Sequence, residues 1–331
     1  MNKKFLAVAI AAVMAAPLTV SAEAVMYGQV RVSVDHVKED VTSVQFRNHH
    51  SRLGVRGSED LGNGLKALYA MEFGVDIGGV GGANTLNNPA NEFGGGANLS
   101  NRNAFVGLAG NWGTLILGRH DTPLKISTGR LDYFADTVGD NNLYYTENLA
   151  DRRANGTIAY ITPSMGGLTI ATAIVPGEND QARGLADAYS VAAMYSNSGF
   201  YGSAAIEGAD KDIDALGGAA DLEQIRFGLG YDSGTWKIGA VWENLELDYA
   251  APGMGKGDWD AWAINGAYSF GNNTVKAKWF DAEHSHKGFA LGLDHNLSKR
   301  TQAYIMYVDS DNRVSGEPDT RVWSVGMNHS F

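Results

Sequence analysis

The sequence predicts an all-β fold, a 16-stranded antiparallel transmembrane β-barrel. Apolar and polar residues alternate along many short segments, which is typical of strands with one apolar and one polar face. The chain contains 42 glycines but only 7 prolines, and this composition suits many strands joined by turns. Short and long connections also alternate along the chain, as in a membrane barrel whose turns and loops lie at opposite ends.

The strand pattern is clearest around residue 240, where Trp236, Ile238, Ala240 and Trp242 share one face and Lys237 lies on the other. Sixteen segments carry it: 25–35, 46–58, 64–75, 101–110, 113–120, 154–162, 167–175, 187–196, 199–208, 222–233, 234–247, 258–270, 273–283, 286–297, 300–309 and 321–331.

The connections alternate in length. Tight turns rich in Gly, Asn and Asp, residues that tolerate hairpin geometry, are expected at Glu59–Gly64, Gly110–Gly113, Pro163–Gly167, Asn197–Gly199, Asp232–Gly234, Gly271–Asn273 and Asn296–Lys299. Longer connections are expected at 36–45, 76–100, 121–153, 176–186, 209–221, 248–257 and 310–320, with a short one near His284–Ser285. A barrel of sixteen strands whose two chain termini lie on the same side of the membrane needs this arrangement of short turns at one end and long loops at the other.

The two ends of the chain predict export to an outer membrane. Lys3 and Lys4 precede an apolar run that ends in small residues, as in a secretory signal peptide. We expect a signal peptide over 1–22, cleaved after Ala22 or Ala24, and a single barrel over 23–331. The last strand ends at Phe331 and resembles the last strand of Gram-negative outer-membrane barrels, so the chain is expected to cross the periplasm.

Composition excludes several classes of protein. The chain has no cysteine and a formal net charge of −11, so neither a disulfide framework nor a basic nucleic-acid surface is expected. Beyond the signal peptide, no run approaches the roughly 20 apolar residues of a membrane-spanning helix. Neither His49-His50 nor the acidic segment 309–312 has the spacing of metal ligands. We expect no metal, no cofactor and no nucleic-acid partner.

Several motifs resemble the general porins of Gram-negative bacteria, especially the neisserial and β-proteobacterial type. The segment SRLGVRGSEDLGNGLKA (Ser51–Ala67) is similar to the second strand and turn of that family. Ala104–Leu108, Trp112–Leu115 and Leu117–Arg119 also match it, as do Tyr27-Gly28 and the terminal Phe331. The resemblance covers essentially the whole mature chain.

The resemblance implies a homotrimer in outer-membrane lipid and lipopolysaccharide, through which small hydrophilic solutes and ions diffuse passively. It also implies that the third external loop folds inward and narrows each pore. Here that loop runs from Asp121 to about Asp151. The residues support a functional loop independently, because it is the longest connection and long loops in compact structures usually have a function.

Strand alternation predicts which basic residues line the pore wall. Because Leu53 and Val55 are expected to face lipid, the neighbouring arginines of that strand should point inward. The same argument applies to the first strand and to the strands on either side of the third loop. The predicted wall set is Arg31, Arg52, Arg56, Arg119, Arg153 and Lys66, and Arg119 also matches a basic wall position of the family. The direction of Arg102 stays open.

The middle of the third loop is acidic and aromatic, and Asp132, Tyr133, Asp136 and Asp140 are its predicted constriction residues. Arginines opposite these aspartates would create a transverse electric field, and the charges at a narrowing set selectivity. Guanidinium groups suit this role because they stay charged and have a fixed planar geometry. Alternatively, some arginines only anchor the loop, and both roles are open for Arg56 and Arg119.

Other functions have weaker support. A substrate-specific channel for sugars or organic anions on the same barrel would need an aromatic track, which only Tyr133 and Phe134 could begin. An outer-membrane enzyme is less favoured, because the one suggestive cluster is His284-Ser285-His286 and adjacent strand residues point to opposite faces. There is no Gly-x-Ser-x-Gly elbow. An adhesin on the same barrel is a further alternative, and we predict that the chain is not an enzyme.

Overall fold

The computed structural model describes residues 24–78, 99–141, 151–177, 184–210, 220–249 and 256–331. These ranges contain seventeen strand segments, one short α-helix and one 3-10 turn, and no helix in them is long and apolar enough to cross a membrane. The first segments are β1 (Val25–Lys38), β2 (Thr42–Asn48), β3 (Arg52–Gly62), β4 (Leu65–Val75), β5 (Leu99–Gly110) and β6 (Gly113–Asp121). The helix α2 (Pro123–Thr128) and the turn η1 (Gly129–Leu131) follow β6.

The remaining segments complete the sheet. They are β7 (Arg153–Ile161), β8 (Leu168–Val175), β9 (Ala188–Asn197), β10 (Phe200–Ala209), β11 (Ala220–Asp232), β12 (Trp236–Tyr249), β13 (Lys256–Phe270), β14 (Asn273–Ala282), β15 (His286–Asn296), β16 (Thr301–Asn312) and β17 (Thr320–Ser330). Each pairs with its sequence neighbours in antiparallel register. The predicted signal peptide lies outside the described residues.

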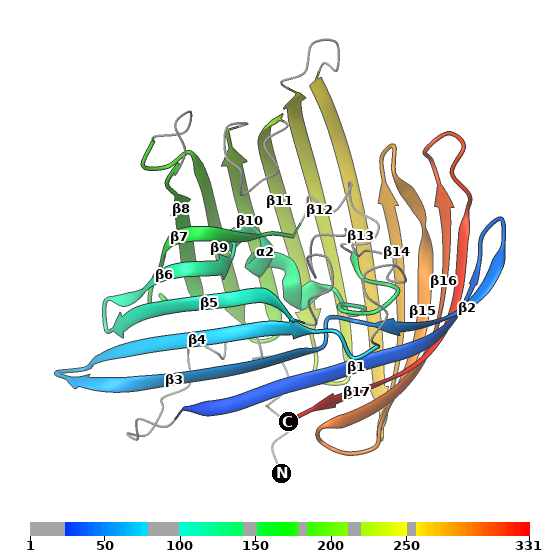
Figure 1. The fold of residues 1–331 in the computed structure, drawn as a ribbon, viewed down its shortest axis with the longest axis horizontal. Coiled ribbons are helices and arrows are strands. Elements are labelled where there is room, and N and C mark those ends of the chain that lie inside the picture. The colour runs from blue at the N-terminus through cyan, green and yellow to red at the C-terminus, as the bar shows by residue number, and fades with distance from the viewer. Residues whose placement is uncertain (1–23, 79–98, 142–150, 178–183, 211–219, 250–255) are drawn as a thin grey trace.

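The sheet closes on itself. β1 pairs with β17 from Gln29↔Ser330 to Lys38↔Arg321, and Gly28 and Phe331 exchange two backbone hydrogen bonds of 3.1 and 3.0 Å. The ribbon therefore forms a barrel in which β1 and β17 lie side by side (Figure 1). Closure removes the unpaired strand edges that lipid would not tolerate, and the strand ending at Phe331 is the last strand of the barrel, as predicted.

The seventeen segments make sixteen strands, because β2 and β3 are two parts of one strand. Both pair with β1, β2 through Val32↔Asn48 and β3 through Gln29↔Arg52. This confirms the predicted number of strands. The predicted long connection at 36–45 is wrong, since β2 already begins at Thr42 and only residues 39–41 separate it from β1. The sequence pattern also missed the break at 49–51.

The two faces of the barrel wall differ in chemistry. Phe227, Trp242 and Trp262 lie next to one another on the outer face, with ring centroids 5.6 and 6.2 Å apart. On the inner face of the same strands Arg226 is paired with Glu243. An apolar exterior around a polar interior matches a barrel set in lipid.

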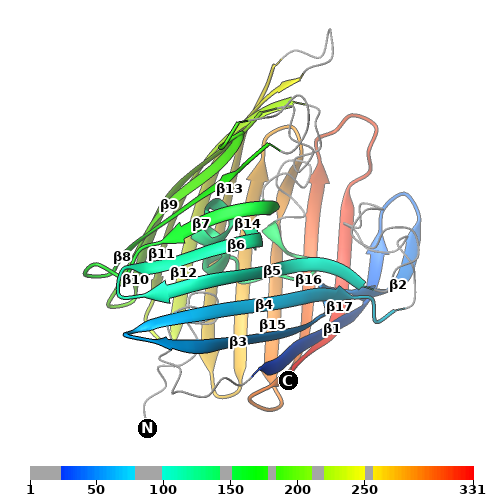
Figure 2. The same cartoon turned by 60° about the vertical axis from the view of Figure 1, so that its left-hand side comes forward.

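We call the connection between β6 and β7, residues 122–152, the constriction loop, and its described residues 122–141 enter the barrel. It begins with the helix α2, which the sequence analysis did not predict. The Thr122 side chain accepts a 3.3 Å hydrogen bond from the Lys125 amide, and Pro123 occupies the first turn, both of which favour a helix start. Two views show α2 inside the ring of strands (Figures 1 and 2).

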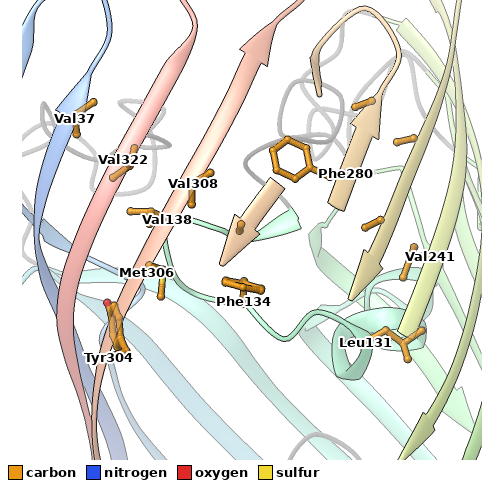
Figure 3. Packing of buried hydrophobic residues seen from close by; sticks show 14 of the residues in the cluster. Val37, Leu131, Phe134, Val138, Val241, Phe280, Tyr304, Met306, Val308 and Val322 are labelled. Carbon is orange, nitrogen blue, oxygen red and sulfur yellow. The ribbon is translucent and has the colours of Figure 1, made fainter. Parts of the chain in front are cut away.

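The largest apolar core lies between the constriction loop and the inner wall (Figure 3). Leu131, Phe134 and Val138 of the loop are buried. They pack in one cluster with wall residues contributed mainly by β12 to β17, among them Val241, Phe280, Met306, Val308 and Val322. Burial of these side chains stabilises the inward position of the loop by about 1.5–3 kcal/mol for each large residue.

Candidate functional site

The tip of the constriction loop meets two wall arginines. The Asp136 Oδ2 atom lies 3.3 Å from Arg52 Nη1 and 3.6 Å from Arg31 Nη1. Arg31 also donates hydrogen bonds to the carbonyl oxygens of Ala135 and Asp136, at 2.5 and 2.9 Å. Arg52 donates a 2.8 Å bond to Gln29 Oε1. The structure therefore brings together Arg31, Arg52 and Asp136, three of the predicted residues.

The electrostatics of this cluster keep Asp136 ionised. Burial by itself raises the pKa of Asp136, but the guanidinium groups of Arg52 and Arg31 outweigh burial, so that the pKa lies well below its usual range. A carboxyl group with a depressed pKa stays charged as pH falls through its ordinary range and loses its stabilising effect only in stronger acid. Asp136 is thus negatively charged throughout the ordinary titration range of a carboxyl group.

Asp140 supports the backbone of the loop tip. Its Oδ2 accepts a 2.5 Å hydrogen bond from the Asp136 amide, while Asp136 itself has a positive φ of 54°. A left-handed backbone at a residue other than glycine costs free energy. Asp140 helps to hold that conformation, so its carboxylate shapes the loop and is directed at the Asp136 backbone.

Asp132 faces a different part of the wall. Its Oδ1 lies 2.6 Å from Lys278 Nζ, and both side chains are almost fully buried. The same carboxylate accepts hydrogen bonds from the Phe134 and Asn141 amides, at 2.9 and 2.7 Å. Asp132 is therefore paired with a lysine of the wall, whereas Asp136 is paired with Arg31 and Arg52.

Two lysines of β14 anchor the loop, and the sequence analysis did not select them. Lys276 Nζ bonds the Tyr133 carbonyl at 3.1 Å and pairs with Asp294 at 3.1 Å. Lys278 Nζ bonds the Gly139 carbonyl at 2.5 Å. Both ammonium groups lie near the Phe134 ring, 4.7 and 5.3 Å from its centroid. Both lysines alternate in the sequence with Val275, Ala277 and Trp279, and this alternation could have predicted that they point into the barrel.

The other predicted wall residues lie away from Asp136. Arg119 donates to Asn155 Oδ1 at 2.5 Å and to the Arg153 carbonyl at 3.2 Å. Arg153 Nε lies 3.1 Å from Asp121 Oδ1, at the start of the loop. The Arg56 guanidinium stacks over the Tyr27 ring at 4.8 Å. Lys66 pairs in register with Asp60 beside the β3–β4 turn, at one end of the barrel.

Tyr133 is half-buried, and burial followed by the charge of Asp232 raises its pKa to about 12. Its hydroxyl therefore stays neutral. Arg102, whose direction the sequence left open, is buried and pairs through Nε with Glu72 Oε1 at 2.7 Å. Glu72 also accepts a 3.1 Å bond from the Tyr27 hydroxyl, which places Arg102 on the inner wall.

A buried arginine joins the two legs of the constriction loop. Arg226 Nη1 lies 3.0 Å from Thr128 Oγ1 on the outgoing leg and 2.7 Å from Asp151 Oδ1 on the returning leg. Its Nε donates a 2.6 Å bond to Glu243 on β12. This buried network fixes the base of the loop against β11 and β12.

The expectation that Ser285 and His286 would not meet is wrong. Ser285 Oγ lies 2.8 Å from His286 Nδ1, because Ser285 belongs to the turn 283–285 and not to a strand. His284 in that turn has a positive φ of 59°. The Ser285 side chain is nevertheless buried. Within the described ranges, no group of three or more His, Cys, Asp or Glu side chains could hold a metal ion.

A closed barrel with an apolar exterior, whose interior is narrowed by a folded-in loop facing wall arginines, defines a membrane channel of the porin class. Comparison with known proteins agrees: the family described as Gram-negative porin matches residues 7–315. The chain belongs to the Gram-negative porin family. It is an outer-membrane porin whose water-filled channel allows passive diffusion of ions and small hydrophilic solutes.

Individual relatives are distant but cover nearly the whole chain. The major outer membrane protein P.IB of Neisseria gonorrhoeae is 26% identical, with 92% of each chain covered. The structure of the anion-selective porin from Comamonas acidovorans has a TM-score of 0.75 at 22% identity, covering 93% of this chain and 99% of that one. The trimer form of OmpT of Vibrio cholerae has a TM-score of 0.64 at 15% identity, covering 93% and 99%.

Proposed function

We propose that the selectivity of this channel is set where the tip of the constriction loop faces Arg31 and Arg52, and that the channel prefers anions. The observation that carries the proposal is the balance of charge. Near the tip, among the described residues with contacts given above, four arginines (Arg31, Arg52, Arg56 and Arg102) accompany the three carboxylates of Asp136, Asp140 and Glu72.

The start of the loop also has more positive than negative side chains. Lys125 and Arg153 both pair with Asp121, at 2.9 and 3.1 Å, and Arg119 lies beside Arg153. The lysines of β14, by contrast, are matched by Asp132 and Asp294. The excess positive charge therefore lies on the β1–β7 side of the lumen. A channel with low-dielectric walls focuses this charge on a permeating ion.

Selectivity should respond to the charges of Arg56 and Arg119, two of the predicted wall arginines. We expect the double variant Arg56→Gln with Arg119→Gln to shift ion selectivity toward cations, because it removes two positive charges from the inner wall. The measurement is the reversal potential of the purified channel in a planar bilayer across a salt gradient.

A matched control is Lys299→Gln with Arg300→Gln, which removes the same charge from an exposed turn between β15 and β16. This control should leave the reversal potential near that of the wild type. A reversal potential that is unchanged in the Arg56 and Arg119 variant would remove both arginines from the selectivity mechanism.

We further infer that the chain assembles as a homotrimer in outer-membrane lipid and lipopolysaccharide after its signal peptide is cleaved after Ala22 or Ala24. Channel insertion in conductance steps of three would support this assembly, and single steps would contradict it. A substrate-specific sugar channel has less support, because Phe134 is fully buried and cannot extend an aromatic track from Tyr133.

We also infer that the barrel is not an enzyme. The Ser285 hydroxyl is buried against His286, so a substrate could not reach it without rearrangement of the turn. We expect no hydrolysis when the purified protein is incubated with phospholipid vesicles. Hydrolysis that is lost in a Ser285→Ala variant would contradict this inference.

A further inference from the structure

The second strand of the barrel contains a one-residue bulge beside the wall arginines. Between the pairs Gln29↔Arg52 and Val32↔Asn48, β1 has two residues and the partner strand has three. The extra residue is accommodated at His50, which has a positive φ of 53°. A bulge changes the direction in which the following side chains of its strand point.

The bulge decides which face of the wall receives Arg52. Side chains alternate along a strand, so one extra residue exchanges the two faces. Before the bulge, Arg47 is buried on the inner side and Phe46 is exposed on the outer side. After it, Leu53 is exposed on the outer side, and Arg52 reaches Asp136 in the lumen. In an unbroken strand with the register of β2, Arg52 would face outward.

The Ser51 side chain holds the bulge together. Its hydroxyl accepts a 2.9 Å hydrogen bond from the Arg31 amide and lies 3.2 Å from the Arg31 carbonyl, to which it donates. The hydroxyl thus takes the place of a strand carbonyl opposite the Arg31 amide, while the Arg31 carbonyl also accepts a 2.9 Å hydrogen bond from the His49 amide. Ser51 is fully buried at 0% exposure, and its own carbonyl accepts a 2.7 Å bond from the Val75 amide.

We propose that Ser51 is a positioning residue for the pore: its hydroxyl fixes the backbone of Arg31 and the face of Arg52, so that both guanidinium groups converge on Asp136. This inference rests on the proposed function, in which these arginines set selectivity. Without the hydroxyl, the buried Arg31 amide loses its partner, and a buried donor without a partner is unfavourable. The bulge then has to shift, and the two arginines move with it.

The test is the permeability ratio of chloride to potassium in planar bilayers. Ser51→Ala should lower the ratio toward that of Arg31→Gln with Arg52→Gln, and Ser51→Thr, which keeps a hydroxyl, should restore most of the wild-type value. Ser310→Ala is the matched control, because Ser310 is equally buried and its hydroxyl has no hydrogen-bond partner within the described residues. It should leave the ratio unchanged.

Non-additivity separates positioning from a general structural effect. In the background that lacks both guanidinium groups, Ser51→Ala should not change the permeability ratio further. A further change of similar size there would overturn the proposal, as would an unchanged ratio in folded Ser51→Ala. If Ser51→Ala does not assemble, Ser51→Cys serves instead, since a thiol is a weak donor and acceptor, and the same outcomes apply.

The variant Arg31→Gln with Arg52→Gln distinguishes this inference from the proposed function. If the ratio is unchanged in Arg31→Gln with Arg52→Gln, these arginines do not set selectivity, and the proposed function fails together with this inference. If that ratio falls while Ser51→Ala keeps the wild-type value, the proposed function stands and only the positioning role of Ser51 is refuted.

Discussion

Deletion of Leu131–Asp140 is expected to raise single-channel conductance severalfold. This segment contains the loop tip and the three apolar side chains that pack against the inner wall, Leu131, Phe134 and Val138. Its removal takes away the part of the loop that crosses the lumen, while the strand pairings that close the barrel are untouched. Because pore diameter is one determinant of conduction, the widened lumen should carry more current.

The deletion is best made with a short Gly-Ser linker between Arg130 and Asn141, and folding is checked by circular dichroism. Replacement of the exposed segment 314–317, between β16 and β17, with the same linker is the control and should leave conductance near the wild-type value. A wild-type conductance in the deletion variant would show that residues 131–140 do not limit the flow of ions.

Most of the barrel could be predicted from the sequence, because a strand between lipid and water has a strict period of two. The predicted segment 222–233 corresponds to β11 (Ala220–Asp232), and 273–283 corresponds to β14 (Asn273–Ala282). The break at 49–51 was missed because the period of two is intact on both sides of it. A bulge conserves the local alternation on each side and changes only the phase between them.

The candidate site was less predictable than the fold. Arg31, Arg52 and Asp136 could be selected because charge on an inward strand position or in a long loop is a sequence signal. Which carboxylate meets which base depends on how the loop folds back, and this is a tertiary property. Asp132 was paired in the prediction with arginines, but it binds Lys278 because Phe134 and Val138 bury the adjacent backbone against β14 and β16.

A second large effect on the single-channel current is expected from substitution of Lys278. Lys278→Met should release the constriction loop from β14 and produce larger and noisier single-channel currents. The variant leaves the buried Asp132 carboxylate without its cationic partner and the Gly139 carbonyl without its donor. Breaking a buried ion pair from one side costs about 3–5 kcal/mol. That cost is comparable to the burial of one or two large loop side chains, so the inward position of the loop becomes marginal.

The double variant Lys278→Met with Asp132→Asn separates loss of the anchor from loss of the lysine itself. Replacing both charges removes the uncompensated buried carboxylate, so much of the destabilisation should disappear. Current noise should then fall back toward the wild-type level. Lys287→Met is the control, because this lysine is half-exposed and lies 3.8 Å from Asp281, and such surface pairs contribute little.

Currents in Lys278→Met that are as quiet as those of the wild type, with equal conductance, would show that the apolar contacts of Leu131, Phe134 and Val138 hold the loop without the lysine. Noise that persists in the double variant would instead assign the anchoring role to the bond between Lys278 and the Gly139 carbonyl. The two readouts therefore divide the anchoring of the loop between its charge pair, its backbone hydrogen bond and its apolar core.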